Sequence, residues 1–488
     1  MDNIYKYINS FVNYGIDKNL IDEYDAMYII NNLLRVLNIN EYQCPFERKE
    51  NSLQIDEILE GLINYSIDNG IIENYSYQKD LFDTLIMDLV TPYPSTVINN
   101  FFDLYQINPI EATNYFYNLM IACNYIRINR INKNIIFKSN CQYGDILITI
   151  NLSKPEKDPK EIAKLKLLGN VNNYPKCLLC YENVGFSGNE KLQARNNLRV
   201  IPIELNNERF YMQYSPYIYY NEHCIVFKDN HQDMIINEDT FKRLLDFLDM
   251  FPHYFIGSNA DLPIVGGSIL VHEHYQGGNF IFPLDKATVK YKDVYGNVTI
   301  NYLNWPLDCL QLISDNKKDI INVANKILLK WKAYSNKDLL IYNRSEKGVH
   351  NTITPIARFI EGKYILTLVL RNNYTDEDHP YGLFHPDVSL HHIKKENIGL
   401  IEVMGLAILP GRLKQELKLI DDILKGRETE ENINKISYHK DWYEELKEKE
   451  NLDLYREVAN KFVSVLESCQ VFKYGTIKDV IKFIDSIK

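Results

Sequence analysis

The stretch Gly266-Gly-Ser-Ile-Leu-Val-His-Glu-His-Tyr-Gln-Gly-Gly278 is more informative than any other segment of this chain. If His272-Glu-His-Tyr-Gln276 lies in a β-strand, side-chain alternation places His272, His274 and Gln276 on one face, with neighbours about 6.6 Å apart. Two imidazoles and a carboxamide then lie beside glycine-rich backbone, which an anionic group can approach closely. This pattern favours chemistry at phosphorus.

The residue types in this stretch suit nucleophilic transfer. Imidazole attacks phosphorus at neutral pH because it need not lose a proton first, and the phosphoramidate that it forms is labile enough to turn over. Gln276 can donate a hydrogen bond to a phosphoryl oxygen but cannot deliver a proton. A leaving group that departs as an anion, such as a sugar phosphate with a second pKa near 6, needs no strong general acid.

Length and charge restrict the class of protein. A chain of 488 residues is long enough for two to three domains. Its 54 basic and 65 acidic residues give a net charge of −11, which argues against binding to nucleic acid or to anionic membrane surfaces. No apolar run reaches the roughly 18 residues of a membrane span, and the start lacks the layout of a signal peptide. We expect a cytoplasmic protein.

Hydrophobic periodicity predicts an α+β fold. Apolar residues recur at helical spacing up to about residue 135, and the period changes to two from Asp145. Strands are expected over residues 145–152, 198–205, 209–213, 223–227, 267–275, 339–342, 351–359 and 364–371, and helices over 237–248, 396–408 and the tail from 413. The two β-rich parts indicate a duplicated unit. We divide the chain into a helical N-terminal region (1–138), a catalytic unit (139–330) and a second unit with a helical tail (331–488).

Cys177 and Cys180 form the one C-x-x-C motif among eight cysteines. Spacing alone leaves a redox pair, half of a zinc site and chance all open. Zinc needs two more ligands, and His223 and His272 are the candidates, which would leave His274 free. The alternative for His223, which opens an apolar strand, is a half-buried histidine with a structural role.

Several blocks together resemble the galactose-1-phosphate uridylyltransferase family, specifically its second class from Gram-positive bacteria. These blocks are Phe255–Gly278, Tyr174–Gly185, Arg195–Pro202, His350–Arg358 and His391–Gly405. Similarity near Asp80 and over Ile150–Pro155 extends it over nearly the whole chain. The family belongs to the histidine-triad superfamily, so the resemblance implies duplicated antiparallel sheet units of that type.

The resemblance also implies roles for individual residues. His274 corresponds to the nucleophile that becomes uridylylated, and Gln276 to the residue that holds the phosphoryl group. The metal ligands of zinc-binding relatives map onto Cys177, Cys180, His223 and His272. Asn259, Gly266, Gly267 and Ser268 match the segment lining the nucleotide-sugar site. Arg195, Arg199 and Arg371 are candidate cations for phosphate oxygens, with a solvated surface charge as the alternative for each.

The implied reaction is a ping-pong transfer of UMP from UDP-glucose to galactose 1-phosphate, which gives UDP-galactose, by a zinc-containing homodimer. Two other classes stay open: a histidine-triad hydrolase or phosphorylase of nucleotides, and a non-catalytic zinc-stabilised binding protein. A thiol oxidoreductase that uses Cys177 and Cys180 is a further alternative. The residues themselves indicate no role for Glu273. The histidines at positions 350, 385, 391 and 392 could bind sugar or a second metal, with a structural or exposed position as the alternative for most of them.

Overall fold

The structure is a computed structural model that describes residues 2–153, 174–189, 192–267, 269–427 and 429–488. Helices occupy the N-terminal part of the chain, as the periodicity predicts. They are α1 (Asp2–Asp17), α2 (Ala26–Val36), α3 (Ile55–Asp68), α4 (Ser76–Asp88), α5 (Pro94–Ile107), α6 (Pro109–Ala122) and α7 (Ile128–Ile131). None of the described helices combines the length and apolarity needed to cross a membrane.

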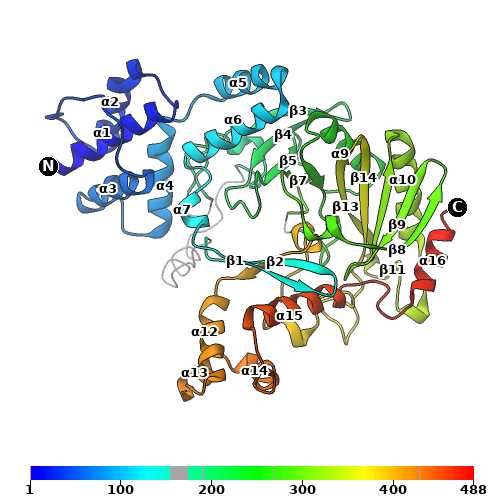
Figure 1. Cartoon of the computed structure of the whole chain (residues 1–488). Coiled ribbons are helices and arrows are strands. Elements are labelled where there is room, and N and C mark those ends of the chain that lie inside the picture. The colour runs from blue at the N-terminus through cyan, green and yellow to red at the C-terminus, as the bar shows by residue number, and fades with distance from the viewer. Residues whose placement is uncertain (1, 154–173, 190–191, 268, 428) are drawn as a thin grey trace.

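A ten-stranded antiparallel sheet forms the centre of the molecule (Figure 1), in the order β3-β4-β5-β7-β6-β13-β14-β10-β9-β8. Its first half contains β3 (Ile201–Leu205), β4 (Glu208–Tyr214), β5 (Cys224–Lys228), β6 (Phe255–Gly257) and β7 (His274–Gly278). Its second half contains β8 (Val289–Tyr295), β9 (Val298–Leu303), β10 (Cys309–Ser314), β13 (Asn351–Ile360) and β14 (Lys363–Asn372). The short β11 (Arg344–Ser345) and β12 (Gly348–Val349) pair separately.

The two halves repeat one topology. In each, three strands form a meander, a helix follows, and a second pair of strands returns so that its last strand pairs with the third. The helices are α9 (Glu238–Met250) and α10 (Lys317–Ala333). The halves meet where β6 pairs with β13, with Gly257 opposite Ile356. The duplication is therefore present in the topology, but the predicted boundary after residue 330 falls inside α10.

Two hydrophobic cores cover the two faces of this sheet. One contains the N-terminal helices together with side chains of α9 and α10. The other contains side chains of the three-stranded sheet β1 (Ile135–Cys141), β2 (Gly144–Asn151) and β15 (Leu406–Pro410) and of the helices between residues 413 and 468. The remaining helices are α11 (Leu400–Val403), α12 (Leu413–Leu424), α13 (Glu430–Lys435), α14 (Lys440–Lys447), α15 (Leu454–Ser468) and α16 (Ile477–Asp485).

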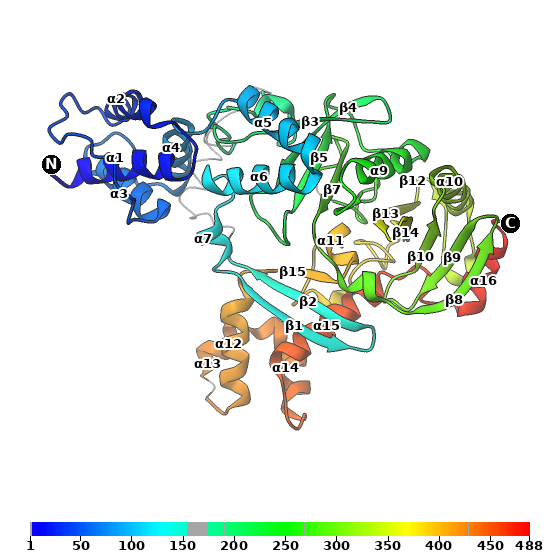
Figure 2. The same ribbon diagram turned by 45° about the horizontal axis from the view of Figure 1, so that its top comes forward.

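The expected helix over 396–408 is wrong. This segment contains the short α11 and then β15, which pairs in parallel with β2. Figure 2 shows α1–α4 at one end of the molecule and α10 with the C-terminus at the other. The first half of the central sheet lies between them.

Candidate functional site

Strand β7 carries the two side chains for which catalytic roles were predicted. It begins at His274, so the expected strand is absent from the described residues between 267 and 273. His274 and Gln276 are two positions apart in the strand and share one face, whereas His272 precedes it. Their face is that of Phe255 and Ile356, which belong to the core formed with the C-terminal region.

His274 has a defined tautomer. Its Nδ1 lies 2.8 Å from the carbonyl oxygen of His272. A carbonyl oxygen only accepts, so Nδ1 carries the proton and the Nε2 lone pair is available for attack. The described residues provide no hydrogen-bond partner for Nε2. Burial lowers the pKa of His274 to about 4, so the imidazole is neutral near pH 7.

Four side chains that could hold a metal lie together beside β7 and form the metal-binding group: Cys177, Cys180, His231 and His272. Cys177 Sγ lies 3.2 Å from His272 Nδ1, and Cys180 Sγ lies 3.2 Å from His231 Nδ1. Two thiols and two imidazoles are a set typical of tetrahedral zinc. Burial raises the pKa of Cys180 to about 11, so a thiolate there needs a nearby cation. The four side chains therefore fit a divalent metal.

The fourth member of this group is His231, and the prediction of His223 is corrected. In the antiparallel pair of β5 and β7, Phe227 lies opposite His274, so the end of β5 is near His272. His223 precedes β5 at its other end, roughly 20 Å away at about 3.3 Å per residue. Its Nε2 lies instead 3.3 Å from Gln276 Oε1. Sequence reasoning missed His231 because the pairing register of β5 and β7, which brings this residue near His272, cannot be read from the sequence.

A network of hydrogen bonds and buried ion pairs surrounds His272 and its neighbour Glu273, next to the metal-binding group. His272 Nε2 donates to the carbonyl oxygen of Lys228 at 2.7 Å, which directs Nδ1 towards the cysteines. Glu273, 2% exposed, accepts from Arg243 at 2.6 Å, from Gln232 at 2.9 Å and from Tyr275 at 2.8 Å. Glu208 pairs with both Arg243 and Lys228. Glu273 thus joins β7 to α9 on the face opposite His274.

The glycine-rich segment before β7 packs against Asn259. A Cβ atom added at Gly267 would lie 2.5 Å from Asn259 Nδ2, and one at Gly266 would lie 2.3 Å from the carbonyl oxygen of Ala260. A side chain at either position would displace its neighbour. Asn259 Oδ1 accepts from the backbone N–H of Leu400 at 2.9 Å, which ties this segment to α11. Ser268 lies outside the described residues.

The three arginines proposed as phosphate ligands are buried and contact other protein groups. Arg195 donates to the Tyr125 hydroxyl. Arg199 donates to backbone carbonyl oxygens of Pro92, Asn196, Leu198 and Thr91, a set of contacts typical of a structural residue. Arg371 donates to the carbonyl oxygen of Ile398 at 3.0 Å.

The histidines of the C-terminal half form no metal-binding group within the part of the chain that the structure describes. His350 contacts Asn373 and Ser345, and His392 contacts His439. His385 and His391 lie closer together, with ring centroids 6.0 Å apart. Among the described residues, only the Cys177 group has the composition and spacing of a metal site.

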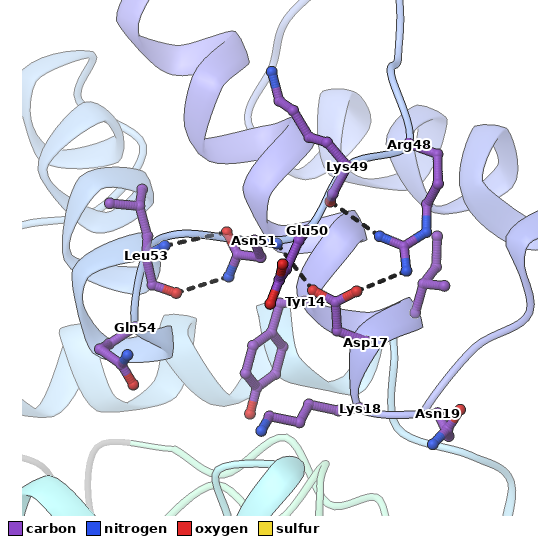
Figure 3. Close-up of a pocket in the computed structure, with 11 residues that line it drawn as sticks. Tyr14, Asp17, Lys18, Asn19, Arg48, Lys49, Glu50, Asn51, Leu53 and Gln54 are labelled. Atoms are coloured by element: carbon purple, nitrogen blue, oxygen red, sulfur yellow. Dashed lines mark hydrogen bonds and ion pairs between the residues drawn. The ribbon is translucent and has the colours of Figure 1, made fainter.

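A cavity of about 840 Å³ in the N-terminal helical region is distinct from this site (Figure 3). Tyr14, Arg48 and Gln54 are among its lining residues, and Arg48 pairs with Asp17 at 2.7 Å. It contains none of the residues predicted for catalysis, substrate binding or metal binding.

Family models match most of the chain. Residues 22–233 match the N-terminal domain of galactose-1-phosphate uridyl transferase, and residues 247–444 match its C-terminal domain. The chain belongs to the galactose-1-phosphate uridylyltransferase family. Its sequence is 48% identical to the galactose-1-phosphate uridylyltransferase of Clostridium acetobutylicum, over 96% of each chain. It is 47% identical to that of Fusobacterium nucleatum, over 96% of this chain and 95% of the relative.

A solved structure of yeast Ap4A phosphorylase is a distant structural match, with a TM-score of 0.35 and 10% sequence identity over 70% of this chain and 94% of that one. Membership of the family rests on the sequence matches, and it agrees with the resemblance seen in the motifs.

Proposed function

We propose that this protein is a galactose-1-phosphate uridylyltransferase that works through a uridylyl-His274 intermediate. The observation that carries this proposal is the hydrogen bond from His274 Nδ1 to the His272 carbonyl oxygen, because it directs the Nε2 lone pair towards a substrate. Full-length similarity to enzymes of this name supports the substrates, UDP-glucose and galactose 1-phosphate.

In the first step His274 Nε2 attacks the α-phosphorus of UDP-glucose. The N–P bond forms as the P–O bond to glucose 1-phosphate breaks, and glucose 1-phosphate leaves as an anion. In the second step a phosphate oxygen of galactose 1-phosphate attacks the same phosphorus, which gives UDP-galactose and free His274. Gln276 donates to a non-bridging oxygen in both steps, which stabilises the charge that develops there.

We assign the nucleotide-sugar site to Asn259, Gly266, Gly267 and Ser268, because small residues beside β7 allow close approach of phosphate oxygens. Zinc held by Cys177, Cys180, His231 and His272 would stabilise the start of β7 and orient His272, whose carbonyl oxygen fixes His274. We expect a cytoplasmic homodimer without nucleic-acid or membrane partners, an expectation that rests on composition and on the resemblance.

Intact-mass spectrometry with UDP-glucose and no acceptor tests the proposal. We expect a uridylyl adduct on the wild type that galactose 1-phosphate removes, and none on His274→Ala. Free UMP without an adduct would indicate a hydrolase. Neither adduct nor turnover would indicate a binding protein. Activity that survives His274→Ala would indicate chemistry at the cysteines.

A further inference from the structure

We propose that His223 is a positioning residue that sets the orientation of the Gln276 carboxamide for phosphoryl transfer. This inference rests on the proposed function and extends it to a residue outside the metal-binding group. It starts from one contact on the catalytic face of the sheet, where His223 Nε2 lies 3.3 Å from Gln276 Oε1.

The direction of this hydrogen bond decides what Gln276 presents to a substrate. Its Oε1 only accepts, so His223 Nε2 carries the proton and donates. The NH₂ group of the same amide then points away from His223 and is free to donate to a phosphoryl oxygen. A flipped amide would present its carbonyl oxygen to the phosphoryl group. Two oxygens with partial negative charge repel each other, so the flipped amide would not stabilise the phosphoryl group.

The surroundings of His223 favour the tautomer that this arrangement needs. His223 is 3% exposed, and its Nδ1 is buried with no hydrogen-bond partner among the described residues. A proton on Nδ1 would be a buried donor without an acceptor, and such N–H groups are rare and costly. A proton on Nε2 has Gln276 Oε1 as its acceptor.

Burial also lowers the pKa of His223 to about 3, and the bond to Gln276 opposes that shift only partly. The ring is therefore neutral near pH 7 and donates from one nitrogen. It cannot serve as a general acid, so its effect on the reaction passes through Gln276.

Two tyrosines hold the His223 ring in place. The ring centroid of Tyr220 lies 4.4 Å from that of His223, and the centroid of Tyr219 lies 5.9 Å away. Tyr220 also donates to the carbonyl oxygen of Gly277, the residue after Gln276. The segment that carries His223 is thus attached to β7 at two adjacent residues, which keeps the donor and the amide in register.

A double-mutant cycle with His223→Phe and Gln276→Ala tests the inference, with kcat, KM and metal content measured for each variant. Phenylalanine keeps the ring and removes the donor. We expect His223→Phe to lower kcat about tenfold, as for one lost hydrogen bond, with KM within twofold of the wild type. We expect the double variant to be no slower than Gln276→Ala, because His223 acts only through that amide. His223→Gln, whose Nε2 can donate from a similar position, should recover most of kcat.

His253→Phe is the matched control, since His253 is another histidine ring that contacts a tyrosine, Tyr254, but lies outside the site. It should leave kcat unchanged. The inference would be overturned if the fold losses in kcat of the two single variants multiplied in the double variant. Loss of metal from His223→Phe would overturn it as well.

A separate measurement keeps this inference distinct from the proposed function. Selective ¹⁵N labelling of histidine should show His223 protonated at Nε2, with that signal shifted in Gln276→Ala. If the wild type transfers no uridylyl group, the proposed function fails, while the NMR result still decides whether the hydrogen bond exists. An Nδ1-protonated His223 in an active enzyme would overturn the positioning role alone.

Discussion

The two halves of the central sheet share a topology but differ in chemistry. Gln276 on β7 lies in one row with Gly257, Ile356 and, on β14, Thr367. Thr367 is therefore the residue of β14 that lies in the row of Gln276, and Ile365 and Val369, which flank it on the same face of β14, are apolar. β14 reads Lys363-Tyr-Ile-Leu-Thr-Leu-Val-Leu-Arg-Asn372 and contains no histidine. The strand order is thus compatible with either an apolar or a reactive last strand, so the fold alone does not determine the chemistry.

The largest difference should appear when the last strand of each half is changed on the face that carries His274 and Gln276. His274→Ala removes the nucleophile, and we expect the rate of uridylyl transfer to fall by at least about 10⁴-fold. Thr367→Val, in the row of Gln276, should change that rate by less than about twofold, because a nearly isosteric change on the second strand removes no reacting group. Steady-state kinetics on both variants would measure this. Comparable losses would mean that both halves contribute to one reaction centre.

The face covered by the two helices differs between the halves as well. α10 packs through apolar residues such as Ile320, Ala324 and Ile327, whereas α9 reaches Glu273 through the buried Arg243. Glu273→Gln removes the negative partner of a buried pair, and we expect the free energy of unfolding to fall by about 3 kcal/mol. Urea denaturation would measure this change. Lys242→Ala, on the same helix, breaks exposed pairs and should cost less than about 1 kcal/mol.

An equal effect of these two substitutions would show that the network around Glu273 contributes no more than a surface ion pair. A loss of metal from Glu273→Gln together with the fall in stability would show that the network also orients His272.

The group that could hold a metal also lies beside the first half, and the described residues of the second half contain no such group. Four side chains share the binding free energy, about 10–16 kcal/mol for structural zinc, so one ligand accounts for roughly 3 kcal/mol. We expect His231→Ala to lower zinc affinity by more than about 100-fold. Competition with a chelator would measure it. His223→Phe should retain zinc, and the reverse result would restore His223 as the ligand.

Some of the site was predictable from sequence because it depends on local geometry. His274 and Gln276 share a face as soon as a strand is assumed, and Cys177 and Cys180 lie near each other through their spacing alone. His231 was not found because its proximity to His272 depends on the register of β5 with β7, two strands separated by α9 and β6.

The segment from Leu406 to Pro410 shows a second limit of sequence patterns. It is a short apolar run, and such a run does not distinguish a buried strand from a buried helix. Its pairing with β2 involves residues about 260 positions away, with Leu406 opposite Leu147. Local propensity carries no information about such a partner.

The smallest effect concerns a histidine pair outside the central sheet. His392 Nδ1 lies 2.8 Å from His439 Nδ1, and burial, followed by repulsion from His439, lowers the pKa of His392 to about 3. In the unfolded chain this pKa is about 6.5. Below pH 6.5 the unfolded state binds more protons at this histidine than the folded state does. The free energy of unfolding should therefore decrease as the pH is lowered, by up to about 1.4 kcal/mol per pH unit, until the pH nears 3.

At pH 5 the contribution of His392 to this loss is roughly 2 kcal/mol. His392→Asn keeps a donor towards His439 Nδ1 and removes the titration, so the variant should lose less stability than the wild type between pH 7 and pH 5. Urea denaturation of both proteins at the two pH values measures the difference. Burial lowers the pKa of His223 and of His274 in the same direction, so acid should destabilise the first half of the sheet as well, and the comparison with His392→Asn isolates the contribution of His392. Equal losses in both proteins would mean that His392 does not titrate in this range.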